Sequence, residues 1–474
     1  MKIRDQICNP YLPEYEYIPD GEPHVFGDRV YVYGSHDRFD GKKFCLNDYI
    51  CYSAPVDDLT DWRYEGVIYK KTQDIRMTDG THELWAPDVV RGKDGRYYLY
   101  YCPDDSILSI GAAVCDEPAG KYEFYGIVHD KNGKNIGERP GDTYQFDPGV
   151  FIDDDGEIYL YSGNGPRTRR DIGKEPKASV VMTLEDDMLT VKSGPEKLLP
   201  TLGESGGTGF EGHEFFEASS IRKIVKKYYL VYSSVTLHEL CYAVSDYPDR
   251  GFRFGGVVVS NTEGVNCIGN DHGGIEKIGN DWYIFYHRQT NSTMFSRQGC
   301  AEKIVIREDG TIPQAEITSQ GLTGRPLEGN GVYPASMACF LYSKHKPVDT
   351  NPLLMRGRFP YITQSGPDTD PDTEGVKPRQ FVTNMKDGMT IGFRYFKIFG
   401  LKRIGVKVRG RASGKLLIHS TDNGPVYGEI EITPSRRWHI CQGDVKIPSG
   451  IRELRFTFNG RGKFDFLDFA LDAR

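Results

Sequence analysis

The stretch EFFEASSIRKIVKKYYLVYSS, residues 214–234, contains the features that decide both the fold and the chemistry. Its two halves are typical of β-strands on either side of a basic turn, because aromatic and aliphatic residues alternate until lysines interrupt them. Glu217 follows two phenylalanines and precedes small and apolar residues that a folded protein would bury. A carboxylate at this place is either a solvated strand start or a charge held in a pocket.

The second half of this stretch, YYLVYSS at 228–234, recurs in altered form along the chain. The related segments are VYVYGS at 30–35, YYLYYC at 97–102, IYLYSG at 158–163 and WYIFYH at 282–287. Each alternates with period two, as a strand packed on both faces does, and each follows a turn rich in Gly, Asp, Asn or Lys. Successive copies are roughly 54–70 residues apart, enough for a four-stranded sheet with its loops. The sequence therefore predicts an all-β fold that begins with a five-bladed β-propeller.

One ionisable residue lies ten to twelve residues before the central tyrosine of every copy: Asp20, Asp88, Asp147, Glu217 and His272. The first strand of each propeller blade lines the central channel, so we expect these side chains to converge on one axis. Any one of them alone is more often a solvated turn residue. Agreement across all five copies favours a functional role. Converging carboxylates repel one another and lose their hydration, so such a cluster destabilises the fold and persists mainly where function uses it.

Composition excludes several classes of protein. The length of 474 residues predicts about two to three domains. The chain has 54 glycines, 30 tyrosines and 24 phenylalanines, and this composition favours strands over helices. With a formal net charge of −8 and no long basic run, we expect no nucleic-acid partner. No apolar run approaches the roughly 18 residues that span a bilayer, so we expect no membrane partner.

The ten cysteines, at 8, 45, 51, 102, 115, 241, 267, 300, 339 and 441, contain no CxxC pair. Reduced, mostly buried thiols are the simpler interpretation, and a disulfide framework or structural zinc site is not expected. The first residues lack the apolar core of a secretory signal, which predicts a cytoplasmic protein; an extracellular one with its signal removed would look the same.

Three carboxylates around one pocket with apolar neighbours suit glycoside hydrolysis, in which one acid stays protonated and one stays ionised. Glu217 is the natural acid, because Phe215 and Phe216 offer a low-dielectric wall that would raise its pKa. Asp20 or Asp147 would supply the ionised partner. A Ser/His/Asp triad is disfavoured because no GxSxG elbow is present, and GGTG at 206–209 lacks the Lys and Ser/Thr of a phosphate loop.

Residues 1 to about 320 resemble glycoside hydrolase family 43, whose fold is a five-bladed β-propeller. The resembling motifs, in family order, are NPYLPEYEYIPDGEPHVFGDRVYVYGSHD at 9–37, WAPDVV at 85–90, FDPGVFIDDDGEIYLY at 146–161, FFEASSIRKI at 215–224 and GNDHGGI at 269–275. The resemblance implies an inverting enzyme with Asp20 as general base, Glu217 as general acid and Asp147 tuning the pKa of the acid and orienting substrate. Inversion calls for a base–acid separation of roughly 6.5–9.5 Å. PDG replaces the family's common PDP, and EASS replaces EGP, which leaves substrate preference open.

The same resemblance implies a set of pocket residues. Trp85 and Phe146 would wall the sugar pocket, Arg297 would hydrogen-bond sugar hydroxyls, and His36 would line the pocket. His272 would lie on the propeller axis, where many members bind a water-coordinated calcium ion, while the chemistry itself needs no cofactor. The alternatives are a core tryptophan, a surface ion-pair arginine and a core histidine without metal. Asp88 has no catalytic counterpart and is interpreted as structural, and DDD at 153–155 as a turn.

From about residue 327 to 474 the sequence pattern changes to short segments of alternating apolar and polar residues. Such segments predict the strands of a β-sandwich of jelly-roll type. TQSGPDTDPDTEGVKPRQ at 363–380 is polar and proline-rich and predicts a long loop. The unit resembles the sandwiches of carbohydrate-binding module family 6. It either binds carbohydrate or only supports the propeller and shapes its pocket rim. Phenylalanines 456, 458, 464, 466 and 469 alternate regularly and are expected in the core.

We therefore predict an inverting glycosidase that takes an oligosaccharide substrate and removes pentose units, as an α-L-arabinofuranosidase or β-xylosidase does. An endo-arabinanase or a galactan-directed exo-enzyme is the alternative, because loops rather than carboxylates set the substrate. A carbohydrate-binding protein without catalysis is the alternative of another class, and a complete carboxylate set argues against it.

Overall fold

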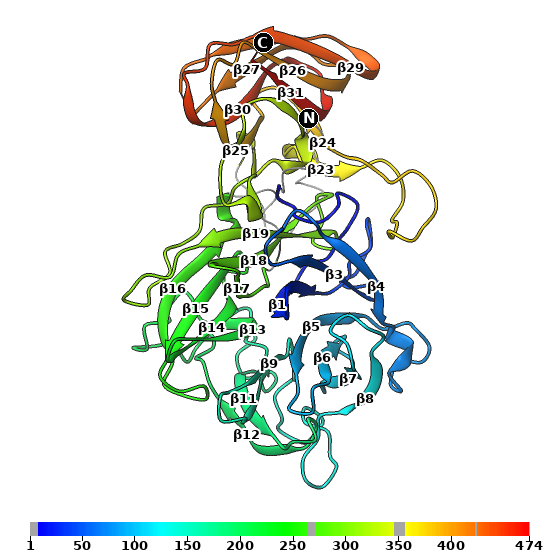
Figure 1. Ribbon diagram of the computed structural model, residues 1–474, viewed down its shortest axis with the longest axis vertical. Coiled ribbons are helices and arrows are strands. Elements are labelled where there is room, and N and C mark those ends of the chain that lie inside the picture. The colour runs from blue at the N-terminus through cyan, green and yellow to red at the C-terminus, as the bar shows by residue number, and fades with distance from the viewer. Residues whose placement is uncertain (1–7, 264–268, 270, 346–355, 422–423, 474) are drawn as a thin grey trace.

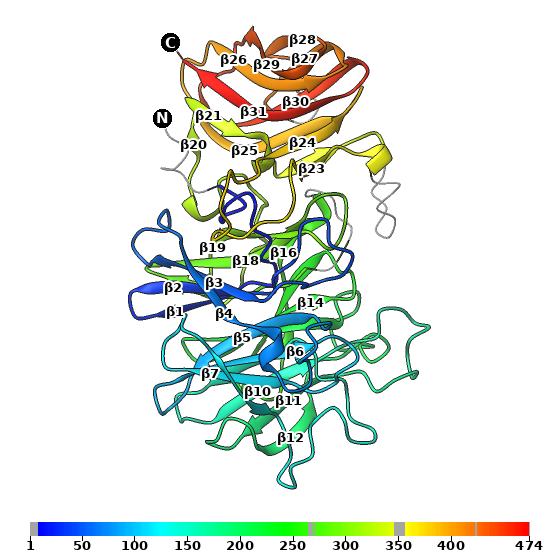
Figure 2. The same cartoon turned by 90° about the vertical axis from the view of Figure 1, so that its right-hand side faces the viewer.

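The computed structural model describes residues 8–263, 269, 271–345, 356–421 and 424–473. Figures 1 and 2 show a propeller, coloured blue to green, and a sandwich, coloured yellow to red, at opposite ends of an elongated molecule. The sheets are antiparallel except for one short parallel pair. Helical structure in the described chain is confined to the short 3-10 turns η2 (Lys71–Gln73), η3 (Asn261–Glu263), η4 (Gly321–Thr323) and η5 (Ala335–Met337), and to residues 356–358. No helix in the described part of the chain is long and apolar enough to cross a membrane.

Five consecutive sheets form the blades, each with its strands in chain order. The first blade contains β1 (Glu22–Phe26), β2 (Arg29–Tyr33), β3 (Tyr49–Pro55) and β4 (Arg63–Tyr69), and the second β5 (Leu84–Arg91), β6 (Tyr97–Pro103), β7 (Gly111–Cys115) and β8 (Glu123–Ile127). The third contains β9 (Gly149–Ile152), β10 (Ile158–Gly163), β11 (Ser179–Leu184) and β12 (Val191–Lys197), and the fourth β13 (Phe215–Ile224), β14 (Lys227–Ser234), β15 (Glu239–Ser245) and β16 (Arg253–Ser260). The fifth has three described strands, β17 (Ile275–Ile278), β18 (Asp281–Gln289) and β19 (Arg297–Ile304).

The first strands of the blades form a closed ring around the axis. β1 lies against β5, β5 against β9, β9 against β13, β13 against β17, and β17 against β1. Figure 1 shows these five strands gathered at the centre, with the later strands of each blade outside them. The five recurring aromatic segments are the second strands β2, β6, β10, β14 and β18, so the predicted five-bladed propeller is confirmed.

The segment before β1 closes the ring at the outer side of the fifth blade. The Asn9 side chain donates from Nδ2 to the carbonyl of Ala301 in β19, and its Oδ1 accepts from the Ala301 backbone N–H. One buried amide thus makes the two hydrogen bonds that a neighbouring strand would make. Asn9 also donates to Glu302, which ties the start of the chain to the end of the propeller.

Asp88 is structural, as the sequence indicates. Its Oδ1 accepts from His24 Nε2 in β1 (2.6 Å), and its Oδ2 accepts from the backbone N–H of Val150 in β9 (2.7 Å). One carboxylate therefore links three neighbouring inner strands. Asp153 of the DDD segment lies in the predicted turn after β9, where it pairs with Lys223.

The C-terminal part is a sandwich of two six-stranded sheets, as predicted. One sheet runs β20 (Leu327–Glu328), β25 (Thr390–Ile398), β30 (Gly450–Arg461), β27 (Ser413–His419) and β28 (Gly428–Ile432), with β22 (Phe340–Tyr342) also on β25. The other runs β23 (Tyr361–Gln364), β24 (Gln380–Met385), β31 (Phe464–Asp472), β26 (Arg403–Gly410) and β29 (Ser435–Asp444), with β21 (Gly331–Pro334) also on β31. The five expected phenylalanines lie in one core between the sheets, each at most 2% exposed.

The predicted domain change at residues 320–327 falls in the connection between β19 and β20. Residues 1–7 of the predicted first domain, Asn270 of the fifth motif and Cys267 lie outside the described residues. The other nine cysteines are free, and seven of them are buried.

The predicted loop at 363–380 connects β23 to β24 and reaches back to the propeller. Its Asp368 accepts hydrogen bonds from the Phe39 backbone N–H (2.7 Å) and from Asn47 Nδ2 (3.1 Å). Buried Tyr17 of the propeller donates to Gln364 and accepts from Gln380. The sandwich is therefore fixed to the chain segments before and after the first hairpin.

Candidate active site

A cavity of about 450 Å³ lies where the inner strands of the propeller meet. Every blade contributes to its lining: Asp20 before β1, Trp85 in β5, Asp147 before β9, Glu217 in β13 and His272 before β17. The three carboxylates are buried, with 3%, 4% and 5% of Asp20, Asp147 and Glu217 exposed. The structure thus brings together four of the five recurring ionisable residues, and Asp88 alone lies elsewhere.

Left-handed backbone aims these carboxylates into the cavity. Asp20 has φ 56°, Asp147 has φ 46°, and Ala218, directly after Glu217, has φ 69°. Around Glu217 the register between β13 and β14 shifts twice, which is the mark of a β-bulge. Non-glycine residues adopt this conformation at a cost, and they cluster where function needs an aimed side chain.

Asp20 is held as an anion. Arg297 Nη1 donates to its Oδ1 (2.8 Å), and Ser35 Oγ donates to its Oδ2 (2.6 Å). Burial by itself would raise the pKa of Asp20, but the Arg297 guanidinium, together with His287, outweighs burial and holds that pKa well below its usual range.

Arg297 binds two carboxylates, and its hydrogen bonds to sugar hydroxyls stay a prediction. It lines the cavity but is only 1% exposed, and its Nε and Nη2 donate to the two oxygens of Asp37 (2.9 and 3.0 Å). Three of its nitrogens are therefore committed to Asp37 and Asp20. The geometry makes Arg297 the counter-ion that fixes Asp20.

Asp147 and His272 form a buried pair on the axis, with Oδ2 of the carboxylate 3.4 Å from Nδ1 of the ring. Burial disfavours the charged imidazolium, but the carboxylates of Asp147 and Asp20 outweigh burial and raise the pKa of His272 to about 9. Burial also raises the pKa of Asp147. The two groups therefore hold a proton between them, and their contact fixes the orientation of Asp147.

Glu217 contacts a short polar chain. Asn164 Nδ2 donates to Glu217 Oε2 (3.3 Å), and Lys177 Nζ donates to Asn164 Oδ1 (2.8 Å). Of the two flanking phenylalanines, Phe216 lines the cavity, whereas Phe215 is fully buried and packs on Tyr232 outside it. The bulge allows the adjacent residues Phe216 and Glu217 both to face the cavity, which regular alternation would forbid.

Aromatic side chains form the wall opposite these charges. Trp85 and Phe146 meet edge to face at 5.0 Å, and Tyr144 packs against Phe146 at 5.2 Å. Trp85 Nε1 and Tyr144 Oη are buried without a hydrogen-bond partner among the described residues. A bound molecule with hydroxyl groups would supply those partners.

His36 does not line this cavity, so the prediction that it does is wrong. It lines a separate hollow with Arg38 and Asp370, and its Nδ1 bonds the carbonyl oxygen of Asp48 (2.9 Å). Neighbouring side chains of an extended chain point to opposite sides, so Asp37, which faces Arg297, directs His36 away.

Sequence reasoning missed several residues of the site, some that line the cavity and one, Asp37, that binds Arg297 behind it. Asn164 follows β10 in the segment SGNG, and a polar residue at the end of a strand next to the axis was a usable signal. Asp37 lay within the GSHD motif beside the residue chosen. Phe44, Asp105, Tyr144 and Lys177 come from loops without any repeated pattern.

The residues around His272 do not by themselves fit a calcium site. Calcium takes six to eight oxygen ligands, whereas His272 is a charged imidazolium paired with Asp147. The nearby cluster of Glu22, His24 and Asp88 has one carboxylate oxygen, Glu22 Oε1, without a hydrogen-bond partner among the described residues. The calcium ion stays a prediction.

Three buried carboxylates and an aromatic wall around one cavity, at the axis of a five-bladed propeller, define a glycoside hydrolase site. Comparison with known proteins agrees. The model of the glycosyl hydrolases family 43 matches residues 19–312. A xylosidase/arabinosidase from Thermoclostridium stercorarium is 49% identical over 99% of this chain and 99% of its own length. The chain belongs to glycosyl hydrolase family 43 and is a glycosidase of the inverting type.

Solved structures show the same architecture. A family 43 arabinoxylan arabinofuranohydrolase from Bacillus subtilis aligns with a TM-score of 0.53 at 21% identity, covering 98% of this chain and 97% of that one. A family 43 β-xylosidase/α-arabinofuranosidase from a compost microbial metagenome aligns with a TM-score of 0.51 at 26% identity, covering 64% of this chain and 96% of that one. The first covers the propeller and the sandwich, and the second about two thirds of this chain.

Proposed function

We propose that the chain removes single pentose units, α-L-arabinofuranosyl or β-D-xylosyl, from plant-type oligosaccharides, with Asp20 as base, Glu217 as acid and Asp147 as the orienting carboxylate. The observation that carries these roles is that three carboxyl groups in one cavity have three different environments. Asp20 is bound to a guanidinium, Asp147 faces an imidazolium, and Glu217 accepts a hydrogen bond from the Asn164 amide. The pentose preference rests on the relatives, whose names are xylosidase/arabinosidase.

In the proposed reaction a water molecule loses a proton to Asp20 while its oxygen attacks the anomeric carbon. The glycosidic bond breaks, and the leaving oxygen takes the proton of Glu217. Arg297 keeps Asp20 ionised, which the base requires before the reaction. Asp147, whose orientation His272 fixes, lies in the cavity beside the sugar ring on which positive charge develops.

Lys177 and Asn164 support the acid. Because Asn164 donates to Oε2 of Glu217, this oxygen is fixed as an acceptor, which orients the carboxyl group of the acid. Lys177 holds the Asn164 amide in that orientation through Oδ1. We interpret both as positioning residues.

Substrate hydroxyl groups have specific partners in this proposal. Trp85 Nε1 can only donate and Tyr144 Oη can donate or accept, and both are buried without partners among the described residues. Each would become satisfied when a sugar fills the cavity. The aromatic faces of Trp85 and Phe146 supply the apolar wall on which a sugar ring packs.

The test compares p-nitrophenyl α-L-arabinofuranoside, p-nitrophenyl β-D-xylopyranoside and an arabinoxylo-oligosaccharide, with proton NMR of the first-formed anomer. We expect release of a single pentose with inverted configuration. Retention of configuration would overturn the proposed base. Oligomers as first products from linear arabinan would favour an endo-arabinanase, and galactose release a galactan-directed enzyme. Binding of oligosaccharide without any hydrolysis would favour the non-catalytic alternative.

We further infer that the sandwich shapes the pocket rim. Its Asp368 binds both ends of the segment 39–47, and Phe44 and Cys45 of that segment line the cavity. This contact favours a supporting role over an independent sugar-binding site.

A further inference from the structure

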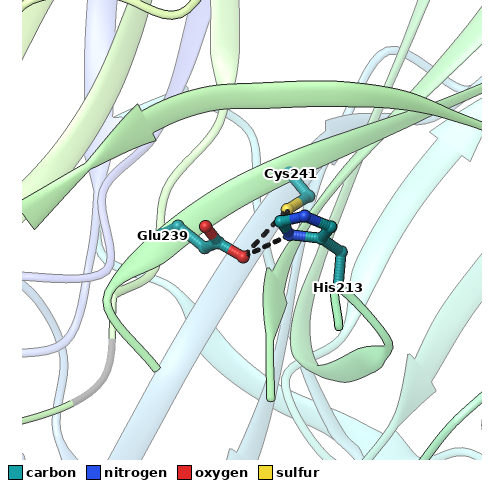
Figure 3. Close-up of side chains that lie close together, drawn as sticks. All are labelled: His213, Glu239 and Cys241. Atoms are coloured by element: carbon teal, nitrogen blue, oxygen red, sulfur yellow. Dashed lines mark hydrogen bonds and ion pairs between the residues drawn. The ribbon is translucent and has the colours of Figure 1, made fainter. Parts of the chain in front are cut away.

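Three side chains of the fourth blade converge outside the catalytic cavity: His213, Glu239 and Cys241 (Figure 3). His213 lies in the segment directly before β13, and the other two lie on β15 with one residue between them, so they share a face of that strand. His213 Nδ1 is 2.7 Å from Glu239 Oε1 and 3.9 Å from Cys241 Sγ, and Sγ is 3.6 Å from the same Oε1.

These distances fit a metal ion. A triangle with sides of 2.7, 3.6 and 3.9 Å has a point about 2 Å from every corner. Zinc in proteins lies about 2.0–2.1 Å from nitrogen, about 2.0–2.2 Å from carboxylate oxygen and about 2.3 Å from sulfur. Small outward movements of the three side chains would complete the fit.

The arrangement does not fit a catalytic relay. In a Cys–His–carboxylate relay the thiol and the carboxylate contact different ring nitrogens. Here both face Nδ1 of His213 (Figure 3), and Cys241 is fully buried. Convergence of three donor atoms on one point is the geometry of ligands.

The cluster of three side chains is accessible to an ion from solvent, and neighbouring residues hold two of its side chains in place. The His213 side chain is 35% exposed while that of Glu239 is 12% exposed, so an ion could enter from the solvent past the imidazole. The His213 ring stacks on Phe254 at 4.8 Å, and Ser234 Oγ donates to Glu239 Oε1 (2.7 Å). Packing and a hydrogen bond of this kind orient metal ligands in known sites.

We propose that His213, Glu239 and Cys241 bind a thiophilic divalent cation of the zinc class, with water at the remaining position. The thiol sulfur and the imidazole nitrogen select such a cation over calcium or magnesium, which prefer oxygen. Binding forms a metal–sulfur bond and releases the thiol proton to solvent. The ion would join β15 to the segment that leads into Glu217, and it would fix the turn of Leu237, which lines the cavity.

The test loads the full-length, metal-stripped protein with Co²⁺ or Zn²⁺. We expect one Co²⁺ per chain with a thiolate-to-cobalt charge-transfer absorption, and a melting temperature several degrees higher with Zn²⁺ than with a chelator. Cys241→Ser should lose the absorption, and His213→Gln, at a partly exposed position, should weaken Zn²⁺ binding at least tenfold. Cys115→Ser, which changes a thiol of the second blade, should behave like wild type.

Two results would overturn the proposal. One is a wild-type protein without the cobalt–thiolate absorption and with the same melting temperature in Zn²⁺ and chelator. The other is metal binding that both His213→Gln and Cys241→Ser retain in full. The cluster of Glu22, His24 and Asp88 has no sulfur, so binding there would give no thiolate absorption.

Discussion

Glu217 is the residue whose replacement separates chemistry from binding. Glu217→Gln keeps the side-chain volume and removes the transferable proton. We expect it to lower kcat on an arabinoxylo-oligosaccharide by about 10²–10⁴. The loss on p-nitrophenyl glycosides should be much smaller, because nitrophenolate leaves without an acid. Steady-state kinetics on both substrates measure the difference.

The matched control is Glu196→Gln, which makes the same change at an exposed position on β12. It should leave both activities unchanged. Equal losses on the natural and the nitrophenyl substrate in Glu217→Gln would contradict the role of this residue as the acid.

Arg297 determines the acid side of the pH profile. Its guanidinium holds the pKa of Asp20 low against burial, so Arg297→Met should raise that pKa and move the acidic limb of kcat/KM to higher pH by one unit or more. Arg297→Lys keeps the positive charge but loses the two-pronged contact with Asp37, so its shift should be smaller. An acidic limb that stays in place in both variants would remove Asp20 from the role of base.

At the scale of the element, the bulge in β13 determines how Glu217 is aimed. Ala218 is buried at φ 69°, where a β-branched side chain is strongly strained. Ala218→Val should cost about 2–3 kcal/mol of stability and most of the activity. Ala218→Gly relieves about 1–2 kcal/mol of strain, but it removes a buried methyl group and increases the entropy of the unfolded chain. These effects offset one another, so the free energy of unfolding should change by less than about 1 kcal/mol.

Chemical denaturation and kinetics of the two Ala218 variants check this expectation. If valine were tolerated like glycine, the left-handed backbone at Ala218 would have no part in placing the acid. The comparison is internal, because both substitutions act at one buried position.

The blade strands could be predicted because their signal is local. Alternation with period two is visible in each aromatic segment, and the repeat spacing then indicated the propeller. The positive φ of Asp20 and Asp147 could not be predicted, because aspartate is equally common in ordinary turns. The prediction chose His36 instead of Asp37. That choice failed because the contacts that decide which of two neighbouring side chains faces inward are made with residues far away in the sequence. The pairing of Arg297 with Asp37 likewise joins residues far apart in sequence.

At the scale of the whole molecule, Asp368 connects the sandwich to the pocket rim. Asp368→Ala removes two hydrogen bonds to the segment that carries Phe44. We expect KM to rise several-fold with a smaller change in kcat, and stability to fall by about 1–3 kcal/mol. Glu374→Ala, at an exposed position of the same loop, should change neither. An unchanged KM in Asp368→Ala would argue against the rim-shaping role of the sandwich.

Glu302 couples the stability of the whole molecule to pH. It lies 3% exposed where the start of the chain, β19 and the connection to the sandwich meet, and it accepts from Asn9 Nδ2 (2.8 Å) and the Thr318 backbone N–H (2.7 Å). Burial raises the pKa of Glu302 from 4.5 to about 8. The folded state therefore binds a proton between pH 4.5 and 8 that the unfolded state has lost. Within that window the free energy of unfolding falls as pH rises.

Glu302→Gln should abolish this contribution, because glutamine resembles the protonated side chain at every pH. Near pH 5 the variant and wild type should unfold at similar temperatures, and near pH 8 the variant should be the more stable by a few kcal/mol. Thermal unfolding at four pH values from 5 to 8 measures the two slopes. Glu308→Gln, at an exposed turn of the same blade, should follow wild type. Parallel curves for wild type and Glu302→Gln would show that Glu302 is already ionised in the folded protein, because only a proton held by the folded state makes the curves diverge.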